Sequence, residues 1–153
     1  MIFKDDLKLG KKIEHIVCNY IVKKKYPKSF VVEGYNKGYD IVVPEVNKTI
    51  EVKYDYMSEK TGNYMFETEY DGKESGLTTT TANWWVHVDN DIMIWIQPSV
   101  LEFILKDYKV IKMSAIGDSK EKSGYLIPKN KLIYTPYTFV TYHSEIIKKL
   151  IIN

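Results

Sequence analysis

The chain has 153 residues, of which 44% are hydrophobic and 27% charged, and its formal net charge is +2. This length supports one domain with a sizeable core, the hydrophobic content excludes wholesale disorder, and the small net charge excludes a polycation. The sequence lacks an apolar run of membrane-spanning length, an apolar leader after Met1, and a second cysteine that could pair with Cys18. We therefore expect a cytoplasmic protein, of a bacterial or phage-infected cell, with no membrane partner.

An amphipathic helix is the first predicted element. Asp5 or Asp6 can cap it, and it ends near Lys25 because Pro27 follows. Its buried stripe consists of Leu9, Ile13, Ile16, Val17 and Tyr20. Glu14 falls at the edge of this stripe, where a carboxylate can reach a neighbouring sheet.

A strand at 30–33 and a glycine-flanked loop at 34–38 lead into a predicted β-hairpin. Its strands are 41–43 and 49–53, joined by a turn from Pro44 to Lys48. If the turn centres on residues 45 and 46, Asp40 lies opposite Glu51, and Lys53 shares their face of the sheet. The other face collects Ile41, Val43, Ile50, Val52 and Tyr54 for the core. A slip of one residue would break both patterns.

The rest of the sequence alternates strands with helices. We expect strands at 63–70, 86–88, 92–96 and 109–113, and a helix at 99–106 after Pro98. A short capped helix with core tryptophans is expected at 78–85, a polar loop at 114–124, resumed structure at 125–128, and a final helix at 144–152. Together these elements predict one α/β domain, residues 1–153, with a mixed central β-sheet flanked by helices.

Asp40, Glu51 and Lys53 together suggest chemistry on phosphate esters. Two nearby carboxylates repel each other, which raises a proton affinity or recruits a hard cation such as Mg²⁺ or Mn²⁺. A lysine beside them can orient a nucleophile and stabilise developing negative charge. The alternative is that all three are ordinary charges on the wet face of a sheet.

These residues also resemble a known family. Asp40, ten intervening residues and the triplet Glu51-Val52-Lys53 are similar to the motif of the PD-(D/E)XK nuclease superfamily. Residues 10–14 resemble the helical glutamate motif that often precedes it, so the likeness covers about the first third of the chain. The family's proline is replaced by Tyr39. Residues 75–85 also resemble a segment of phage-encoded members.

The resemblance implies a restriction-endonuclease-like fold and a Mg²⁺ cofactor, for which Mn²⁺ can substitute. It implies that Asp40, Glu51 and Glu14 bind the metal and that Lys53 assists catalysis. The expected function is a metal-dependent DNA endonuclease, either a structure-selective enzyme resembling a Holliday junction resolvase or a phage DNA-processing nuclease. The alternatives are a sequence-specific restriction-like endonuclease and a non-catalytic nucleic-acid-binding protein. A second copy of the chain is an expected partner, because a two-fold axis relates two DNA strands.

DNA is the expected substrate, and its backbone is the expected contact. The 22 basic residues are all lysine, whereas arginine makes the commonest direct contact to guanine. Hydroxyl groups at a helix start can also bind phosphate. The candidate DNA-binding residues are Lys11, Lys12, Lys73, Thr78, Thr79 and Thr80. Glu67 and Glu69 share one face of their strand and could add a ligand, although solvated strand charges are the favoured interpretation. We expect His15, His87 and His143 to be surface or core residues without a catalytic role.

Overall fold

The computed structural model describes residues 2–34, 38–114 and 120–142. The helices are α1 (Ile2–Lys24), α2 (Ser58–Thr61), α3 (Pro98–Leu105) and α4 (Lys129–Ile133), with 3₁₀ turns η1 (Pro44–Val46) and η2 (Gly76–Thr78). The strands are β1 (Phe30–Val31), β2 (Ile41–Val43), β3 (Lys48–Tyr54), β4 (Asn63–Tyr70), β5 (Lys73–Glu74), β6 (Trp84–Val88), β7 (Ile92–Ile96), β8 (Val110–Ser114), β9 (Glu121–Pro128) and β10 (Phe139–Tyr142).

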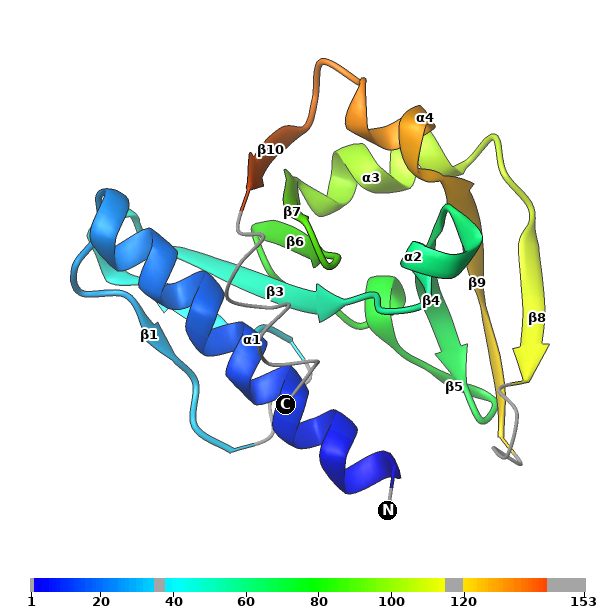
Figure 1. Cartoon of the computed structure of the whole chain (residues 1–153), viewed down its shortest axis with the longest axis horizontal. Helices are drawn as coiled ribbons and strands as arrows, with labels where there is room; N and C mark the ends of the chain where they lie inside the picture. The colour runs from blue at the N-terminus through cyan, green and yellow to red at the C-terminus, as the bar shows by residue number, and fades with distance from the viewer. Residues whose placement is uncertain (1, 35–37, 115–119, 143–153) are drawn as a thin grey trace.

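The strands form two sheets. The first has six strands in the order β1-β2-β3-β6-β7-β10 and is mixed, because β3 and β6 run parallel while the other neighbours are antiparallel. The second has four antiparallel strands in the order β5-β4-β9-β8. Helix α1 lies across the first sheet, and the second sheet stands at the other end of the molecule (Figure 1). The predicted α/β fold with a mixed sheet flanked by helices is confirmed, although the second sheet was not predicted.

Helix α1 packs partly through the predicted stripe. Ile13 and Val17 are buried in one core with Ile41 and Val52 of the hairpin, and Ile21, outside the predicted stripe, continues their spacing of four residues. The other predicted members of the stripe are only partly buried: Leu9, Ile16 and Tyr20. The helix begins at Ile2, so the predicted start at Asp5 or Asp6 is wrong, and it continues without a break through Gly10. This packing places the middle of α1 over the hairpin.

The hairpin has the predicted register. Ile41 lies opposite Ile50, and Val43 lies opposite Lys48. The same register places Asp40 opposite Glu51. The turn is a 3₁₀ turn at 44–46, closed by Asn47 in the left-handed conformation, with φ of +51°. Asparagine tolerates this conformation better than most residues do, so the turn is locally encoded.

A group of buried polar side chains links the two sheets. The His87 imidazole is buried, accepts a hydrogen bond from the Trp85 indole at 3.2 Å, and lies 2.9 Å from the Asp55 carboxylate. Asp55 also accepts the Met65 amide of β4 at 2.9 Å. His87 is therefore the satisfied core histidine that was predicted. His15 is exposed as predicted, and His143 lies outside the described residues.

Several predicted elements need correction. The helix expected at 78–85 is absent, because strand β6 begins at Trp84 and pairs with β3 from that residue on. Trp85 is nevertheless in the core, as expected, while Trp84 is half-buried. The loop expected at 114–124 is shorter, since β8 extends to Ser114 and β9 starts at Glu121. The helix expected at 144–152 lies outside the described residues.

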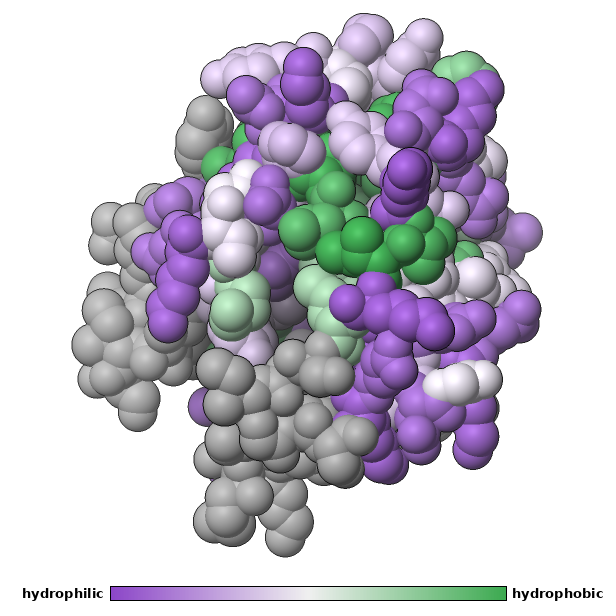
Figure 2. Space-filling model, turned by 90° about the vertical axis from the view of Figure 1, so that its right-hand side faces the viewer, coloured by the Kyte–Doolittle hydropathy of each residue, from purple (hydrophilic) through white to green (hydrophobic). Residues whose placement is uncertain are grey.

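The outer face of the second sheet carries half-buried apolar residues. Ile111, Met113 and Leu126 share this face by the register of β8 with β9. Figure 2 views the molecule from this side and shows apolar side chains gathered among hydrophilic ones. None of the described helices is both long and apolar enough to cross a membrane.

Two glycine substitutions should have opposite effects on stability. A Cβ at Gly124 of β9 would lie 2.3 Å from the Phe66 carbonyl oxygen, so Gly124→Ala should lower the free energy of unfolding by about 1–3 kcal/mol. A Cβ at Gly10 meets no described atom within 4 Å, so Gly10→Ala should raise it by about 0.5–1 kcal/mol. Urea titration of both variants measures these changes. Equal destabilisation by both would contradict this packing.

Candidate active site

Asp40 joins the two strands of the hairpin at the candidate site. Its amide donates to the Ile50 carbonyl at 2.8 Å, and its carboxylate Oδ2 accepts the Val52 amide at 2.8 Å. Val52 stands between Glu51 and Lys53, so this bond fixes the Asp40 carboxylate against the strand that carries both. The geometry follows from the register of the hairpin, which was predicted from the sequence.

Glu14 reaches the same place from helix α1. Its carboxyl group is close enough to Asp40 for each to act on the other's charge, and its Oε2 lies 3.0 Å from the Lys11 ammonium. Lys11 also donates to the Val32 carbonyl at 2.9 Å, which ties the helix to the chain leading into the hairpin.

Glu51 is the most deeply buried of these carboxylates. Only 6% of its surface is exposed, and its Oε2 is sealed from solvent with no hydrogen-bond partner. Its Oε1 lies 3.5 Å from the Lys53 ammonium, whose side chain is 43% exposed. Glu51 is therefore not an ordinary charge on the solvent-exposed face of the sheet, so that alternative prediction is wrong for this residue. A buried ionised oxygen without a partner is costly, so this position favours a proton or a cation.

Burial and mutual repulsion change the proton affinity of the cluster. Burial raises the pKa of Glu51 to about 8, against the pull of Lys53 and with a contribution from Asp40. Burial likewise raises the pKa of Asp40, and burial together with the Asp40 charge raises that of Glu14. All three neighbouring carboxyl groups therefore have raised pKa values. A positive charge placed among them would stabilise their ionised forms.

Glu67 is a further carboxylate near the site. Burial lowers the pKa of Lys53, but Glu51, Asp40 and Glu67 outweigh burial and raise it. Glu67 lies on β4, outside the family-like motif, and was predicted to be solvated. It is instead half-buried and close enough to Lys53 to act on its charge.

The position of Glu67 depends on a turn packed against β4. Ser75 Oγ donates to Glu67 Oε2 at 2.7 Å, and the Ser75 amide donates to the Thr68 carbonyl at 3.0 Å. The register of β4 with β9 shifts between Glu67 and Glu69, as in a β-bulge, which commonly re-aims a side chain beside a functional site. Gly76, with φ of +56°, lies so close to Glu67 that any Cβ would be 2.3 Å from its carbonyl oxygen.

The predicted phosphate contacts from the threonines are not supported. The hydroxyl groups of Thr78, Thr79 and Thr80 donate to backbone carbonyl oxygens at 2.7, 3.3 and 3.1 Å, so these protons are already used. The segment has only a 3₁₀ turn of three residues, which provides no helix start for an anion. The threonines instead hold the turn against β4 and the residues before Asp40.

The lysines predicted to bind DNA occupy different settings. Lys11 is committed to Glu14 and the Val32 carbonyl, so it serves the carboxylate cluster. Lys12 is exposed on α1, and Lys73 is exposed on β5. These two remain available to a phosphate backbone.

The carboxylates suit a hydrated divalent cation. Among the described residues, no three Asp, Glu, His or Cys side chains stand close enough to enclose a metal ion unaided. Mg²⁺ does not require such a cage, because it retains several waters and binds through one or two carboxylates. The unpartnered Glu51 Oε2 and the adjacent Asp40 carboxylate provide hard oxygen donors of this kind.

No family model, curated protein or solved structure matches the chain. The chemistry of this site must therefore be inferred from its own residues.

The burial of Glu51 should make stability depend on pH. Its pKa is about 8 when folded and near 4.5 when exposed, so the folded state retains a proton that the unfolded chain releases between these values. The free energy of unfolding should therefore fall as pH rises from about 4.5 to about 8. Glu51→Gln should remove this loss. Since each kcal/mol shifts Tm by roughly 2–4 °C, the variant should melt about 5 °C or more above wild type at pH 8 without metal.

Thermal unfolding in EDTA from pH 5 to pH 9 measures this difference. Glu74→Gln, an exposed carboxylate on β5, is the matched control and should follow the wild-type curve. Parallel curves for wild type and Glu51→Gln would contradict the burial of an unpaired carboxylate.

Removing the Glu67 charge should lower the pKa of Lys53, because one of its three carboxylate neighbours is lost. Glu67→Gln tests this by NMR titration of ¹³C-methylated lysines. Glu69→Gln, an exposed change two residues along the same strand, should leave the Lys53 titration unaltered. Equal titration curves in wild type and Glu67→Gln would exclude Glu67 from the site.

Proposed function

We propose that the chain is a divalent-metal-dependent DNA endonuclease of the PD-(D/E)XK type. The observation that carries the proposal is the buried, unpartnered Glu51 carboxylate oxygen beside Asp40, with Lys53 extending from the same strand into solvent. Ordinary surface charges would be hydrated, and an ordinary core would not bury a carboxyl group beside two half-buried ones. This arrangement suits a bound cation next to an exposed lysine, which is what phosphodiester hydrolysis requires.

Each residue has a role that follows from its setting. Asp40 and Glu51 would hold Mg²⁺, and Glu14 would support them from α1, where its carboxyl group lies close enough to Asp40 to act on its charge. The bound ion would supply positive charge against the charge that develops on the scissile phosphate. Lys53 would contact that phosphate and orient the attacking water, since its ammonium remains partly exposed while Glu51 anchors it. Glu67 would keep Lys53 protonated.

The same site admits several DNA substrates. Branched DNA or a phage DNA-processing intermediate is our first candidate, because lysine contacts phosphates as a point charge and the chain has no arginine for bidentate readout of guanine. A restriction-like, sequence-specific enzyme is the second. Two strands related by a two-fold axis would be cut by a homodimer. A non-catalytic nucleic-acid-binding protein on this fold would not need to retain Asp40, Glu51 and Lys53 together.

Asp40→Asn and Glu51→Gln should each lower Mg²⁺-dependent cleavage by several orders of magnitude, because each removes metal-binding charge while preserving shape. DNA binding should survive, since a negative charge near the phosphates is removed. Lys53→Ala should lower turnover but retain Mn²⁺ binding, because the ammonium acts on water and phosphate. Gel assays of plasmid cleavage and Mn²⁺ titration measure these effects.

Asp71→Asn is the matched control, because Asp71 is an exposed carboxylate already at positive φ. It should cut like wild type. Full Mg²⁺-dependent cleavage by both Asp40→Asn and Glu51→Gln would remove the proposed site, and loss of Mn²⁺ binding in Lys53→Ala would refute the division of roles.

Substrate choice should depend on DNA shape rather than sequence. A four-way junction should compete better than a linear duplex of the same sequence at fixed salt, and binding should weaken steeply as salt rises. Competition gel shifts with Ca²⁺ in place of Mg²⁺ measure this, because the looser coordination of Ca²⁺ should support binding with little cleavage. Equal affinity for both substrates would exclude the resolvase variant, and cleavage at one short linear sequence would favour the restriction-like enzyme.

A further inference from the structure

An aromatic groove lies on the face of the first sheet that α1 only partly covers. Its volume is about 500 Å³, and its described lining residues come from α1, the hairpin, β6, β7 and β10. Five of them are aromatic: Tyr20, Tyr26, Trp84, Trp95 and Phe139. Phe139 on the edge strand β10 is 65% exposed, and Trp84 and Trp95 are half-buried. The proposed nuclease chemistry uses none of these residues.

The aromatic rings form a connected surface. Trp84 and Phe139 have ring centroids 6.3 Å apart, and Tyr20 and Trp95 have centroids 5.7 Å apart. The register of β10 with β7 sets Phe139 opposite Trp95, which joins the two pairs. The Trp95 indole N–H donates to Thr141 Oγ1 at 2.9 Å, so that ring is held in place. Fixed rings with partly open faces can stack with a planar ligand.

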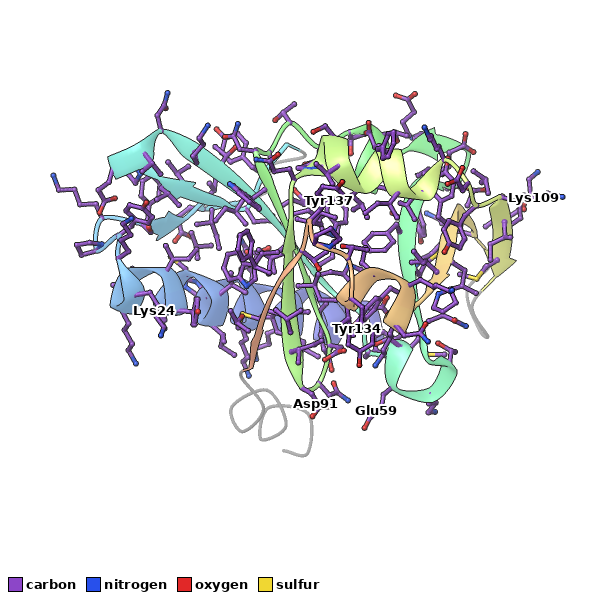
Figure 3. The ribbon with its side chains drawn as sticks, turned by 90° about the horizontal axis from the view of Figure 1, so that it is seen from above. Lys24, Glu59, Asp91, Lys109, Tyr134 and Tyr137 are labelled. Atoms are coloured by element: carbon purple, nitrogen blue, oxygen red, sulfur yellow. The ribbon has the colours of Figure 1, made fainter. Side chains whose placement is uncertain are left out.

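The charges around this groove have one sign. Lys24, Lys25 and Lys48 are the only charged side chains among its described lining residues. The Lys24 ammonium is 5.8 Å from the Tyr20 ring centroid, and the Lys25 ammonium is 5.5 Å from that of Tyr26. Figure 3 shows Lys24 at one end of the molecule and Lys109 at the other. The groove therefore combines apolar ring faces with a cationic rim.

A second, polar pocket adjoins the groove. It has a volume of about 570 Å³ and shares Lys48 and Trp84 with the groove. Its other described lining residues include Thr80, Thr81, Asn83, Gln97, Ser99 and one exposed carboxylate, Glu102. We call the two adjoining pockets the channel, which is aromatic and basic in the groove and is lined by hydroxyl and amide groups and the Glu102 carboxylate in the polar pocket.

We propose that this channel binds an unpaired nucleic-acid strand, with bases stacked on the aromatic rings and phosphates paired with the three lysines. Aromatic stacking combined with a basic groove is how sequence-tolerant single-strand binding is achieved. Every base offers a flat face that can stack on an aromatic ring, and every nucleotide carries one negative charge that a lysine can pair with. Binding to this channel does not depend on cleavage, so the proposal stands apart from the nuclease proposal.

A second copy of the chain fits the channel less well. An interface between copies would bring two sets of lysines together at the aromatic groove, whose described lining residues include no carboxylate, since Glu102 lines the polar pocket instead. An acidic peptide would satisfy the lysines but would not need several open ring faces. Charge and ring geometry together favour the nucleic-acid strand.

Fluorescence anisotropy of a labelled twelve-nucleotide oligothymidine in EDTA tests the proposal, because no metal is present and no cleavage occurs. The strand should bind better than a duplex of equal length and better than an abasic strand of equal charge. Phe139→Ala should weaken binding about tenfold, since stacking on one ring is worth roughly 1–3 kcal/mol. Lys24→Ala should reduce the slope of log affinity against log salt by about 0.7.

Matched controls are exposed residues that do not line the channel. Phe103→Ala removes another exposed phenylalanine, and Lys109→Ala removes another exposed lysine, and neither residue lines the channel. Both should bind like wild type, and all variants should keep the wild-type melting temperature within a few degrees.

Three results would overturn the proposal: equal affinity for the abasic and thymidine strands, equal weakening by Phe139→Ala and Phe103→Ala, or conversion of a dimer to a monomer by Phe139→Ala in sedimentation. The third would identify the groove as an interface between copies.

Discussion

The hydrogen bond from the Val52 amide to the Asp40 carboxylate is the constraint on which the proposed site depends. It fixes Asp40 against β3 at the point where Glu51 enters the protein interior, and Glu14 then approaches Asp40 from α1. The core has no comparable use for three carboxyl groups, because each one that ionises loses hydration which the fold does not replace. We infer that the fold tolerates this cluster because a cation completes it.

The surrounding structure explains how such a cluster can persist. Ile50 and Val52 of β3 are buried in the core under α1, and β3 pairs with β2 on one edge and with β6 on the other, so the strand that carries Glu51 is held in place. Lys53 is the exception, since its side chain emerges beside Glu67 on β4. A rigid strand that presents buried oxygens and one exposed ammonium can bind a cation and a phosphate side by side without rearrangement.

The hairpin could be predicted from the sequence, because strand parity and the turn at 44–47 are local features that fix the Asp40 register. Glu14 followed from helix periodicity in the same way. Glu67 could be named from the sequence as a possible further ligand, but its position beside Lys53 could not be predicted, because it depends on a bulge in β4 and on a distant turn whose close approach only Gly76 permits. The aromatic groove was equally hidden, since Phe139 reaches Trp95 only when β10 pairs with β7. Sequence periodicity describes faces of single elements and not which elements meet.

The most direct test of the account is the number of protons released when Mn²⁺ binds, measured by titration calorimetry in buffers of different ionisation enthalpy at pH 7. Glu51, with a pKa of about 8, holds its proton at this pH when no metal is present. Binding should therefore release close to one proton per ion in the wild type and markedly fewer in Glu51→Gln, if that variant still binds. Binding without proton release, or no binding of Mn²⁺ or Mg²⁺ at all, would contradict a cation site built on the buried carboxylates.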